Sequence, residues 1–164
     1  MICKSKRASR GFSLIELVVV VVIIGIIAAI AIPKMSKGAQ GAADSALTGD
    51  LALLRQAIDM YANEHGGLLP DPTKIATQLT QYSNSDGSKT SATKDTGVNQ
   101  IVFGPYLRAI PPMPVGGSAY KNSASIGLSS ATPAPAWVYD STTGAVTANT
   151  AVGNDSNGTA YSTY

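Results

Sequence analysis

Residues 12–32 read FSLIELVVVVVIIGIIAAIAI, an unbroken apolar run of 21 residues whose one charged side chain is Glu16. As a helix rising ~1.5 Å per residue, the run would be ~31 Å long, about the hydrocarbon thickness of a bilayer. It is too long for one buried strand, and in lipid only a helix satisfies every backbone hydrogen bond within a single segment. The sequence therefore predicts a transmembrane helix over 12–32.

Basic side chains gather in front of this run. Four of the 12 lysines and arginines precede it, namely Lys4, Lys6, Arg7 and Arg10. Basic flanks stay in the cytoplasm, so we expect a cytoplasmic N-terminus and a translocated remainder. Without residues 1–11 the chain would keep eight basic and ten acidic residues, and the net charge would fall from +2 to −2. The basic balance of the whole chain therefore does not indicate nucleic-acid binding.

The residues that usually carry catalysis are sparse. The one cysteine, Cys3, lies before the apolar run, so a chain beginning at Phe12 has neither a disulfide nor a thiolate nucleophile. The one histidine, His65, has no metal-ligand partners at useful spacing. No GxSxG, HExxH, CxxC or phosphate-loop pattern is present. We therefore expect no enzyme and no metal site; a calcium loop around Asp155, within 153–157, is a weak alternative.

An apolar stripe continues the helical pattern beyond the membrane segment. Its members are spaced four, three, four and three residues apart: Leu47, Leu51, Leu54, Ile58 and Tyr61. Gly66 and Gly67 provide a stop signal. We therefore expect one long helix with a transmembrane half at 12–32 and an amphipathic half at 33–66. A break near Pro33, which would give two helices, is the alternative.

The rest of the chain predicts a small globular domain over 67–151 and a flexible tail over 152–164. Residues 136–140 and 145–149 have the pattern of a β-hairpin with a four-residue loop, and a third strand is expected near 125–128. The tail is rich in Gly, Ser, Asn and Thr. The predicted fold class is α+β, with the long N-terminal helix packed on a small C-terminal antiparallel β-sheet.

Between the long helix and the hairpin the pattern is weaker. Asp71–Thr73 predicts an N-cap and a first-turn proline, followed by a short helix that turns Ile75 and Leu79 inward. The polar stretch 83–99 predicts a loop. Residues 101–117 are rich in Gly and Pro and should be extended and irregular. Their apolar anchors would be Tyr106, Leu107 and Ile110.

The junction before the apolar run reads Arg10-Gly11-Phe12-Ser13-Leu14-Ile15-Glu16. With Pro33 placed 21 residues after Phe12, it resembles the G-F-T/S-L-x-E signal of type IV pilins and type II secretion pseudopilins, over about residues 6–40. The resemblance implies that 1–11 is a leader, removed by a prepilin peptidase that cuts between Gly11 and Phe12. It also implies that Phe12 becomes N-methylated and that Pro33 kinks the helix.

Glu16 is the residue expected to direct assembly. A charged carboxylate inside the apolar segment costs roughly 2–3 kcal/mol or more and marks a function. Its nearest cation would be the α-amino group of Phe12 on a neighbouring subunit, freed by cleavage, and this pair would favour one stagger between helices. The alternative is that Glu16 reaches cytoplasmic water and has no partner.

The resemblance further implies a structural filament subunit, single-pass in the inner membrane, with its C-terminal domain in the periplasm. Its partners would be further copies, the prepilin peptidase, the inner-membrane assembly platform and minor pseudopilins, with no nucleic acid. Residues 106–111 and 137–140 are similar to the major pseudopilin, whose pseudopilus drives protein export; a subunit of a surface type IV pilus is the alternative. Residues 113–117 depart from that subfamily, which has Asp-Pro-Trp-Gly and acidic calcium ligands there.

An ordinary secreted protein is the remaining alternative. Ala29-Ile30-Ala31 has the small-x-small pattern of a signal-peptide cleavage site, which would give a mature chain beginning at Ile32. The apolar run is longer than the ~7–15 residues of a usual signal peptide core. Glu16 would also have no role there, so the sequence favours the filament subunit.

Overall fold

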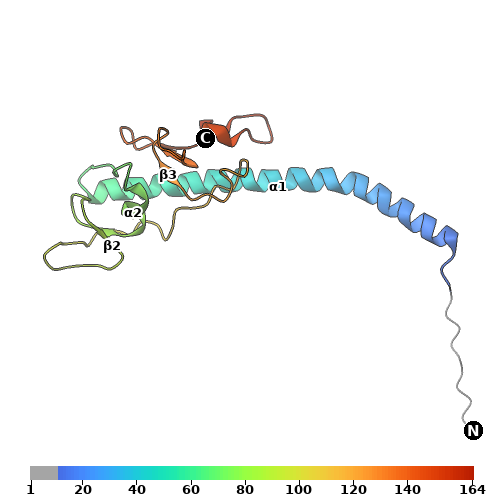
Figure 1. The fold of residues 1–164 in the computed structure, drawn as a ribbon, viewed down its shortest axis with the longest axis horizontal. Helices are drawn as coiled ribbons and strands as arrows, with labels where there is room; N and C mark the ends of the chain where they lie inside the picture. Colours follow the sequence, from blue (N-terminus) through green and yellow to red (C-terminus); the bar gives the residue numbers. More distant parts are fainter. Residues whose placement is uncertain (1–10) are drawn as a thin grey trace, which may run out of the picture. The chain divides into compact units, whose positions relative to one another are not determined.

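The computed structural model describes residues 11–164 of the chain, so most of the expected leader, with Cys3 and its basic residues, lies outside the described residues. The chain forms two compact units, residues 1–39 and residues 40–164. Helix α1 runs from Leu14 to Glu64 and contributes to both units (Figure 1). It continues through Pro33, so the alternative of two separate helices is wrong. The kink expected at Pro33 stays a prediction.

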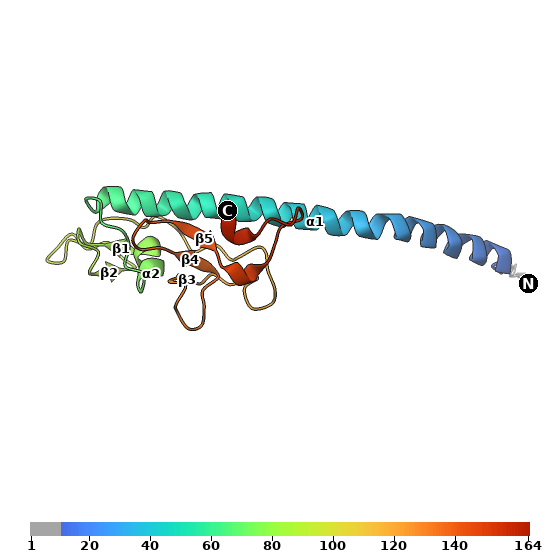
Figure 2. The ribbon, with the colours of Figure 1, turned by 90° about the horizontal axis from the view of Figure 1, so that it is seen from above.

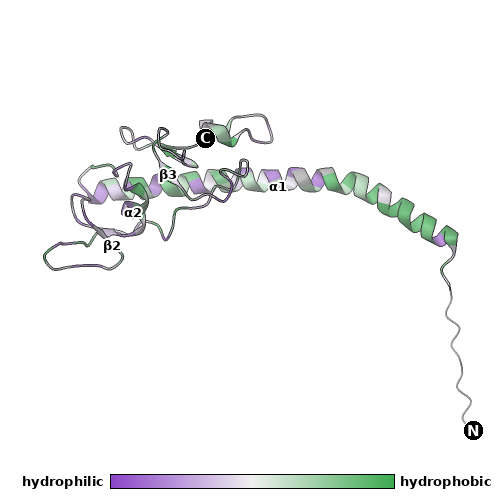
Figure 3. Ribbon diagram, viewed as in Figure 1, coloured by the Kyte–Doolittle hydropathy of each residue, from purple (hydrophilic) through white to green (hydrophobic). Residues whose placement is uncertain are grey.

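The first unit contains the apolar half of α1. Every side chain from Phe12 to Ile27 is exposed, and the helix is coloured as hydrophobic along most of this stretch (Figure 3). Among residues 11–164, α1 is the one helix long and apolar enough to cross a membrane. The structure thus has the helix that the transmembrane prediction requires, with no protein covering its apolar surface.

The second unit is built on the amphipathic half of α1, and here the predicted stripe is confirmed. All five stripe residues, from Leu47 to Tyr61, are at most 1% exposed. They form one core cluster with apolar side chains from the rest of the unit, among them Ile75, Leu79, Met113, Trp137, Tyr139 and Val146. The amphipathic helix therefore forms one wall of the core of this unit.

Helix α1 ends at the predicted glycines. Gly66 has φ +66° and Gly67 has φ +91°, and the Gly67 amide donates to the Ala62 carbonyl at 2.7 Å. This hydrogen bond across five residues, with a left-handed glycine before the donor, is the Schellman pattern that satisfies an orphan carbonyl at a helix end.

The short helix α2, Ile75–Thr80, buries Ile75 and Leu79 as expected. The N-cap prediction was wrong: the cap is Lys74, and no side chain caps the helix. The Asp71 carboxylate instead accepts from the amide and hydroxyl of Thr73, at 2.8 and 2.6 Å. Asp71 therefore closes a turn ahead of the helix, because its carboxylate accepts hydrogen bonds from the residue two positions later in the chain.

The polar stretch predicted as a loop contains a small sheet. Strands β1, Tyr82–Ser83, and β2, Thr90–Ser91, pair antiparallel. Their connection is fastened by Asn84, whose side-chain oxygen accepts from the Lys89 amide at 2.9 Å. The stretch after it, 101–117, is irregular as predicted, and two of its expected anchors, Leu107 and Ile110, are buried while Tyr106 is half-buried.

The predicted hairpin is confirmed in the second sheet. Strands β4, Trp137–Tyr139, and β5, Val146–Ala148, pair antiparallel with Trp137 opposite Ala148 (Figure 2). Trp137 and Tyr139 are buried on one face, while Val138 on the other is half-buried. The third strand, β3, Ile126–Gly127, pairs parallel with β4, so the expected all-antiparallel sheet is mixed instead.

The segment predicted as a flexible tail belongs to the second unit and contacts α1 there. It contains the 3-10 helix η2, Tyr161–Thr163, and follows the 3-10 helix η1, Thr150–Val152. The buried Tyr161 donates its hydroxyl to the Asp44 carboxylate of α1 at 2.6 Å. The Arg55 guanidinium of α1 donates to the main-chain oxygen of Tyr164. The sequence prediction missed these contacts because the partners are distant in sequence, and the flexibility of the segment stays a prediction.

Candidate functional site

The expected processing site lies just ahead of the long helix. Gly11, Phe12 and Ser13 are outside regular secondary structure, and α1 begins at Leu14. Phe12 is 75% exposed, and no heavy atom lies within 4 Å of where a β-carbon on Gly11 would be. The bond between Gly11 and Phe12 is therefore in an exposed, non-helical stretch that a peptidase can reach without unwinding a helix.

Glu16 lies in the first turn of α1 and is exposed. Within residues 11–164, no hydrogen bond or ion pair holds its carboxylate. It is four residues after Phe12, which lies outside the helix. A carboxylate in the first turn also interacts favourably with the helix dipole, by about 0.3–1 kcal/mol.

Residues 13–16 also contain a helix-capping pattern, which the sequence prediction did not include. The Ser13 carbonyl accepts the first helical hydrogen bond, from the Leu17 amide at 3.1 Å, which makes Ser13 the N-cap residue. Glu16 then occupies the third helical position, and Ser13-Leu14-Ile15-Glu16 matches the capping box S-x-x-E. Glu16 therefore has a local role available within its own chain as well as the expected role between chains.

The strongest physical feature of the first unit is its uncovered apolar surface. Fifteen large apolar side chains between residues 12 and 32 are exposed: Phe12, Leu14, Ile15, Leu17, Val18, Val19, Val20, Val21, Val22, Ile23, Ile24, Ile26, Ile27, Ile30 and Ile32. Fully burying one such side chain is worth ~1.5–3 kcal/mol, so covering all of them amounts to tens of kcal/mol. This exceeds the net stability of a typical domain, about 5–15 kcal/mol. The segment therefore requires lipid or other apolar helices around it.

The second unit offers little to a metal ion. Residues 11–164 contain no group of three or more His, Cys, Asp or Glu side chains placed to hold one. The Asp155 carboxylate accepts from the amides of Asn157 and Thr159, at 2.8 and 2.7 Å, and from the Tyr164 hydroxyl at 2.6 Å. The hydrogen bond from Tyr164 is the largest of the influences that lower the pKa of Asp155. These donors occupy the carboxylate that the calcium alternative would need.

His65 has a structural environment. It is 3% exposed, and its ring stacks on Tyr61 with centroids 3.8 Å apart. Nδ1 lies 2.8 Å from the Tyr61 carbonyl and Nε2 lies 3.0 Å from the Ser83 hydroxyl. Because a carbonyl only accepts, Nδ1 carries a proton in this contact, and in the neutral ring Nε2 then accepts from Ser83. Both nitrogens are thus used in joining the end of α1 to strand β1.

The comparisons with known proteins concern the N-terminal segment. Residues 6–32 match the family model of the prokaryotic N-terminal methylation motif. No curated protein and no solved structure matches the chain. The matched segment contains the Gly11–Phe12 junction, Glu16 and the apolar run, and it supports a protein of the type IV pilin class, anchored in a membrane by its N-terminal helix.

Proposed function

We propose that the chain is the subunit of a helical filament, namely a type II secretion pseudopilin whose pseudopilus extends into the periplasm and drives protein export. It is made as a precursor in the inner membrane, cut between Gly11 and Phe12, N-methylated at Phe12 and assembled from the membrane. The observation that carries the proposal is the uncovered apolar surface of α1 up to Ile32, which begins immediately after the cleavable junction.

The same surface explains how one helix can serve both as an anchor and as an assembly element. Lipid tails and a bundle of apolar helices are similarly apolar, so moving α1 from the membrane into a filament core costs little. Direction and register need a polar contact, and Glu16 is the one charged side chain on this surface. Its partner is the freed amine of Phe12 on an adjacent subunit, and low-dielectric surroundings strengthen this pair.

A surface type IV pilus subunit is the second candidate, and one observation favours it. The stretch 113–117 replaces the acidic and aromatic residues of the major pseudopilin with apolar ones. Met113 is 0% exposed and Val115 is 5% exposed, so both belong to the core. This region therefore stabilises the domain by packing, where the major pseudopilin is expected to use calcium.

Two substitutions test the proposal in cells that contain the cognate peptidase and assembly platform. Glu16→Ala should be cleaved normally, as judged by intact mass, but should form few or no filaments by electron microscopy of sheared cell surfaces or periplasmic fractions. Gly11→Leu should keep its leader, because a side chain at this position obstructs a narrow peptidase site. Filaments of normal length from Glu16→Ala would exclude the proposed pairing. The genomic neighbours of the chain, secretion genes or pilus genes, decide between the two filament types.

A further inference from the structure

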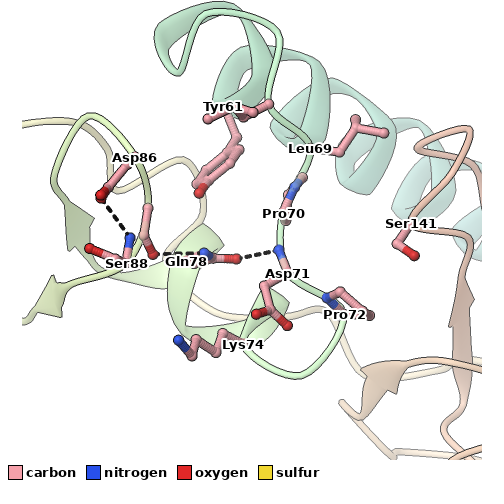
Figure 4. Close-up of a pocket in the computed structure, with 12 residues that line it drawn as sticks. Tyr61, Leu69, Pro70, Asp71, Pro72, Lys74, Gln78, Asp86, Ser88 and Ser141 are labelled. Atoms are coloured by element: carbon pink, nitrogen blue, oxygen red, sulfur yellow. Dashed lines mark hydrogen bonds between the residues drawn. The ribbon is translucent and has the colours of Figure 1, made fainter.

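The second unit has a polar cleft with a volume of about 500 Å³ between the end of α1, the segment leading into α2 and the turn at 86–88 (Figure 4). This volume lies within the usual range for small-ligand sites, about 300–1,000 Å³. The cleft is lined by charged and hydroxyl groups beside apolar ones, and nothing in the proposed filament mechanism uses it.

Gln78 joins the two walls of the cleft. It is 3% exposed; its side-chain oxygen accepts from the Asp71 amide at 2.8 Å, and its nitrogen donates to the Gly87 carbonyl at 2.9 Å (Figure 4). The Asp86 carboxylate accepts from the Ser88 amide at 3.0 Å, which fixes the turn. The cleft is therefore held open in one shape before any ligand arrives, which lowers the entropy cost of binding.

The Tyr61 hydroxyl points into this cleft without a partner. Tyr61 is 1% exposed, and within residues 11–164 its hydroxyl has no hydrogen bond. Figure 4 accordingly draws no bond from this hydroxyl to the other lining residues. Its oxygen lies above Gly87, where an added β-carbon would come within 2.0 Å of it. Every fully enclosed side-chain nitrogen or oxygen within residues 11–164 has a partner, so the Tyr61 oxygen is open to the cleft, where a hydrogen-bonding ligand group can reach it.

The charges around that hydroxyl are mainly negative. Burial raises the pKa of Tyr61, and the negative charges of Asp86 and then Asp71 raise it further. The pKa values of both carboxylates are lowered, chiefly by hydrogen bonds from Ser88 and Thr73, so both are ionised at neutral pH. The one cation lining the cleft is Lys74. The site therefore attracts a cation and repels an anion.

We propose that the cleft binds an organic cation, a guanidinium or ammonium group, which approaches Asp86 and Asp71 and donates a hydrogen bond to the Tyr61 hydroxyl. A metal ion fits less well, because the cleft offers two carboxylates on separate walls, and residues 11–164 contain no group of three or more side chains that could hold a metal. A guanidinium group has several donors in one plane, which suits carboxylates and a phenol oxygen. Leu69 and Pro70 line the same cleft and would contact the aliphatic part of the ligand.

The test uses the full chain in detergent micelles and two matched probes, N-acetyl-argininamide and its neutral isostere N-acetyl-citrullinamide. The arginine probe should shift the amide resonances of Gly87 and Ser88 in a saturable way, and the citrulline probe should not. Asp86→Asn and Tyr61→Phe should each weaken binding of the arginine probe, by about three- to fivefold. Asp59→Asn, on the exposed face of α1 outside the cleft, is the control and should bind as the parent does.

Equal responses to the two probes, or no saturable response to either, would overturn the proposal. Asp86 is exposed and Tyr61→Phe removes a hydroxyl that has no described partner, so both variants should fold. The salt stability of assembled filaments then identifies the natural source of the cation. If a basic side chain of a second copy occupies the cleft, Asp86→Asn filaments should break at lower salt than parental ones. If the occupant is a free compound or peptide, the two filaments should be equally stable.

Discussion

Glu16 occupies a position that two different interactions would each explain. As the third residue of α1 behind Ser13, it occupies the glutamate position of a capping-box sequence, from which its side chain can accept from the Ser13 amide. As the one charge on an apolar surface, it is also placed to meet an amine from another subunit. The first role requires a hydrogen-bonding side chain, whereas the second requires a negative charge.

Glu16→Gln separates these roles, because glutamine retains the capping box and removes the charge. If the charge directs assembly, Glu16→Gln should assemble as poorly as Glu16→Ala, although its helix content by circular dichroism in micelles equals that of the parent. Filament yield, measured by sedimentation, is the readout. Parental yields from Glu16→Gln beside poor yields from Glu16→Ala would assign Glu16 to capping alone.

Tyr161 is the residue that holds the C-terminal segment to α1. Burial, followed by its hydrogen bond to Asp44, raises its pKa to about 12 from the ordinary value near 10. The unfolded chain therefore loses this proton first, and the stability contributed by Tyr161 is complete below pH 10 and is lost as the pH rises towards 12. The pKa of Tyr139, also raised to about 12 by burial, adds to the same loss.

Tyr161→Phe should accordingly lower the free energy of unfolding by about 1–2 kcal/mol at pH 7, because Asp44 loses the donor to its Oδ1 and keeps only the longer hydrogen bonds from Ser156 to its Oδ2. It should also make the decline between pH 10 and pH 12 shallower than in the parent. Urea unfolding in micelles, followed by Trp137 fluorescence at several pH values, gives both quantities. Tyr120→Phe is the control, because Tyr120 is half-buried and its hydroxyl has no hydrogen bond within residues 11–164. An unchanged pH profile in Tyr161→Phe would contradict this account of the tail.

At the scale of elements, the sequence predicted what depends on local periodicity. The stripe from Leu47 to Tyr61 repeats with the helical period, so the prediction of the amphipathic helix and its buried face was confirmed. The predicted burial of Ile75 and Leu79 on α2 was also confirmed. Strands β1 and β2 were missed, because each has two residues of polar sequence and depends on Asn84 and on pairing. The parallel direction of β3 was missed for a similar reason, since it follows from the path of residues 128–136.

Two glycine substitutions in α1 and at its end should change the stability of the second unit in opposite directions. Gly66→Ala should destabilise the second unit by about 1 kcal/mol, because φ is +66° there and an L side chain is strained in that region. Gly49→Ala, in the helix interior with no atom within 4 Å of the added carbon, should stabilise by about 0.5–1 kcal/mol. Thermal unfolding of both variants in the same detergent measures the difference. A stabilising Gly66→Ala would mean that α1 does not end in this left-handed turn.

At the scale of the whole molecule, the chain joins two units that require different surroundings. Residues 12–32 present apolar surface on all sides, while residues 40–164 enclose a core of their own. Composition and periodicity predicted the apolar run and the amphipathic stripe behind it, but not a division of the chain at residues 39 and 40. The candidate site at Gly11, Phe12 and Glu16 was likewise readable from a short local pattern. The polar cleft could not be predicted, because Tyr61, Asp71 and Asp86 meet there only through the path of the folded chain.

Because the core of the second unit lies entirely within residues 40–164, that fragment should fold without the apolar half of α1. Exported to the periplasm, it should be soluble in the absence of detergent and should unfold cooperatively, with Trp137 emission in the blue as for a buried indole. Size-exclusion chromatography and fluorescence check both points. An aggregated fragment, or one with a solvent-exposed tryptophan, would show that the apolar half is needed for the core.

The central claim is that a newly freed amine at Phe12 and the carboxylate of Glu16 turn a membrane anchor into a polymerising helix. The most direct measurement is the N-terminal sequence, with intact mass, of the native protein recovered from assembled material. The account predicts a chain that begins at Phe12 and carries one methyl group on its α-amine. A chain that retains residues 1–11, or that begins at Ile32 as a secreted protein would, contradicts it.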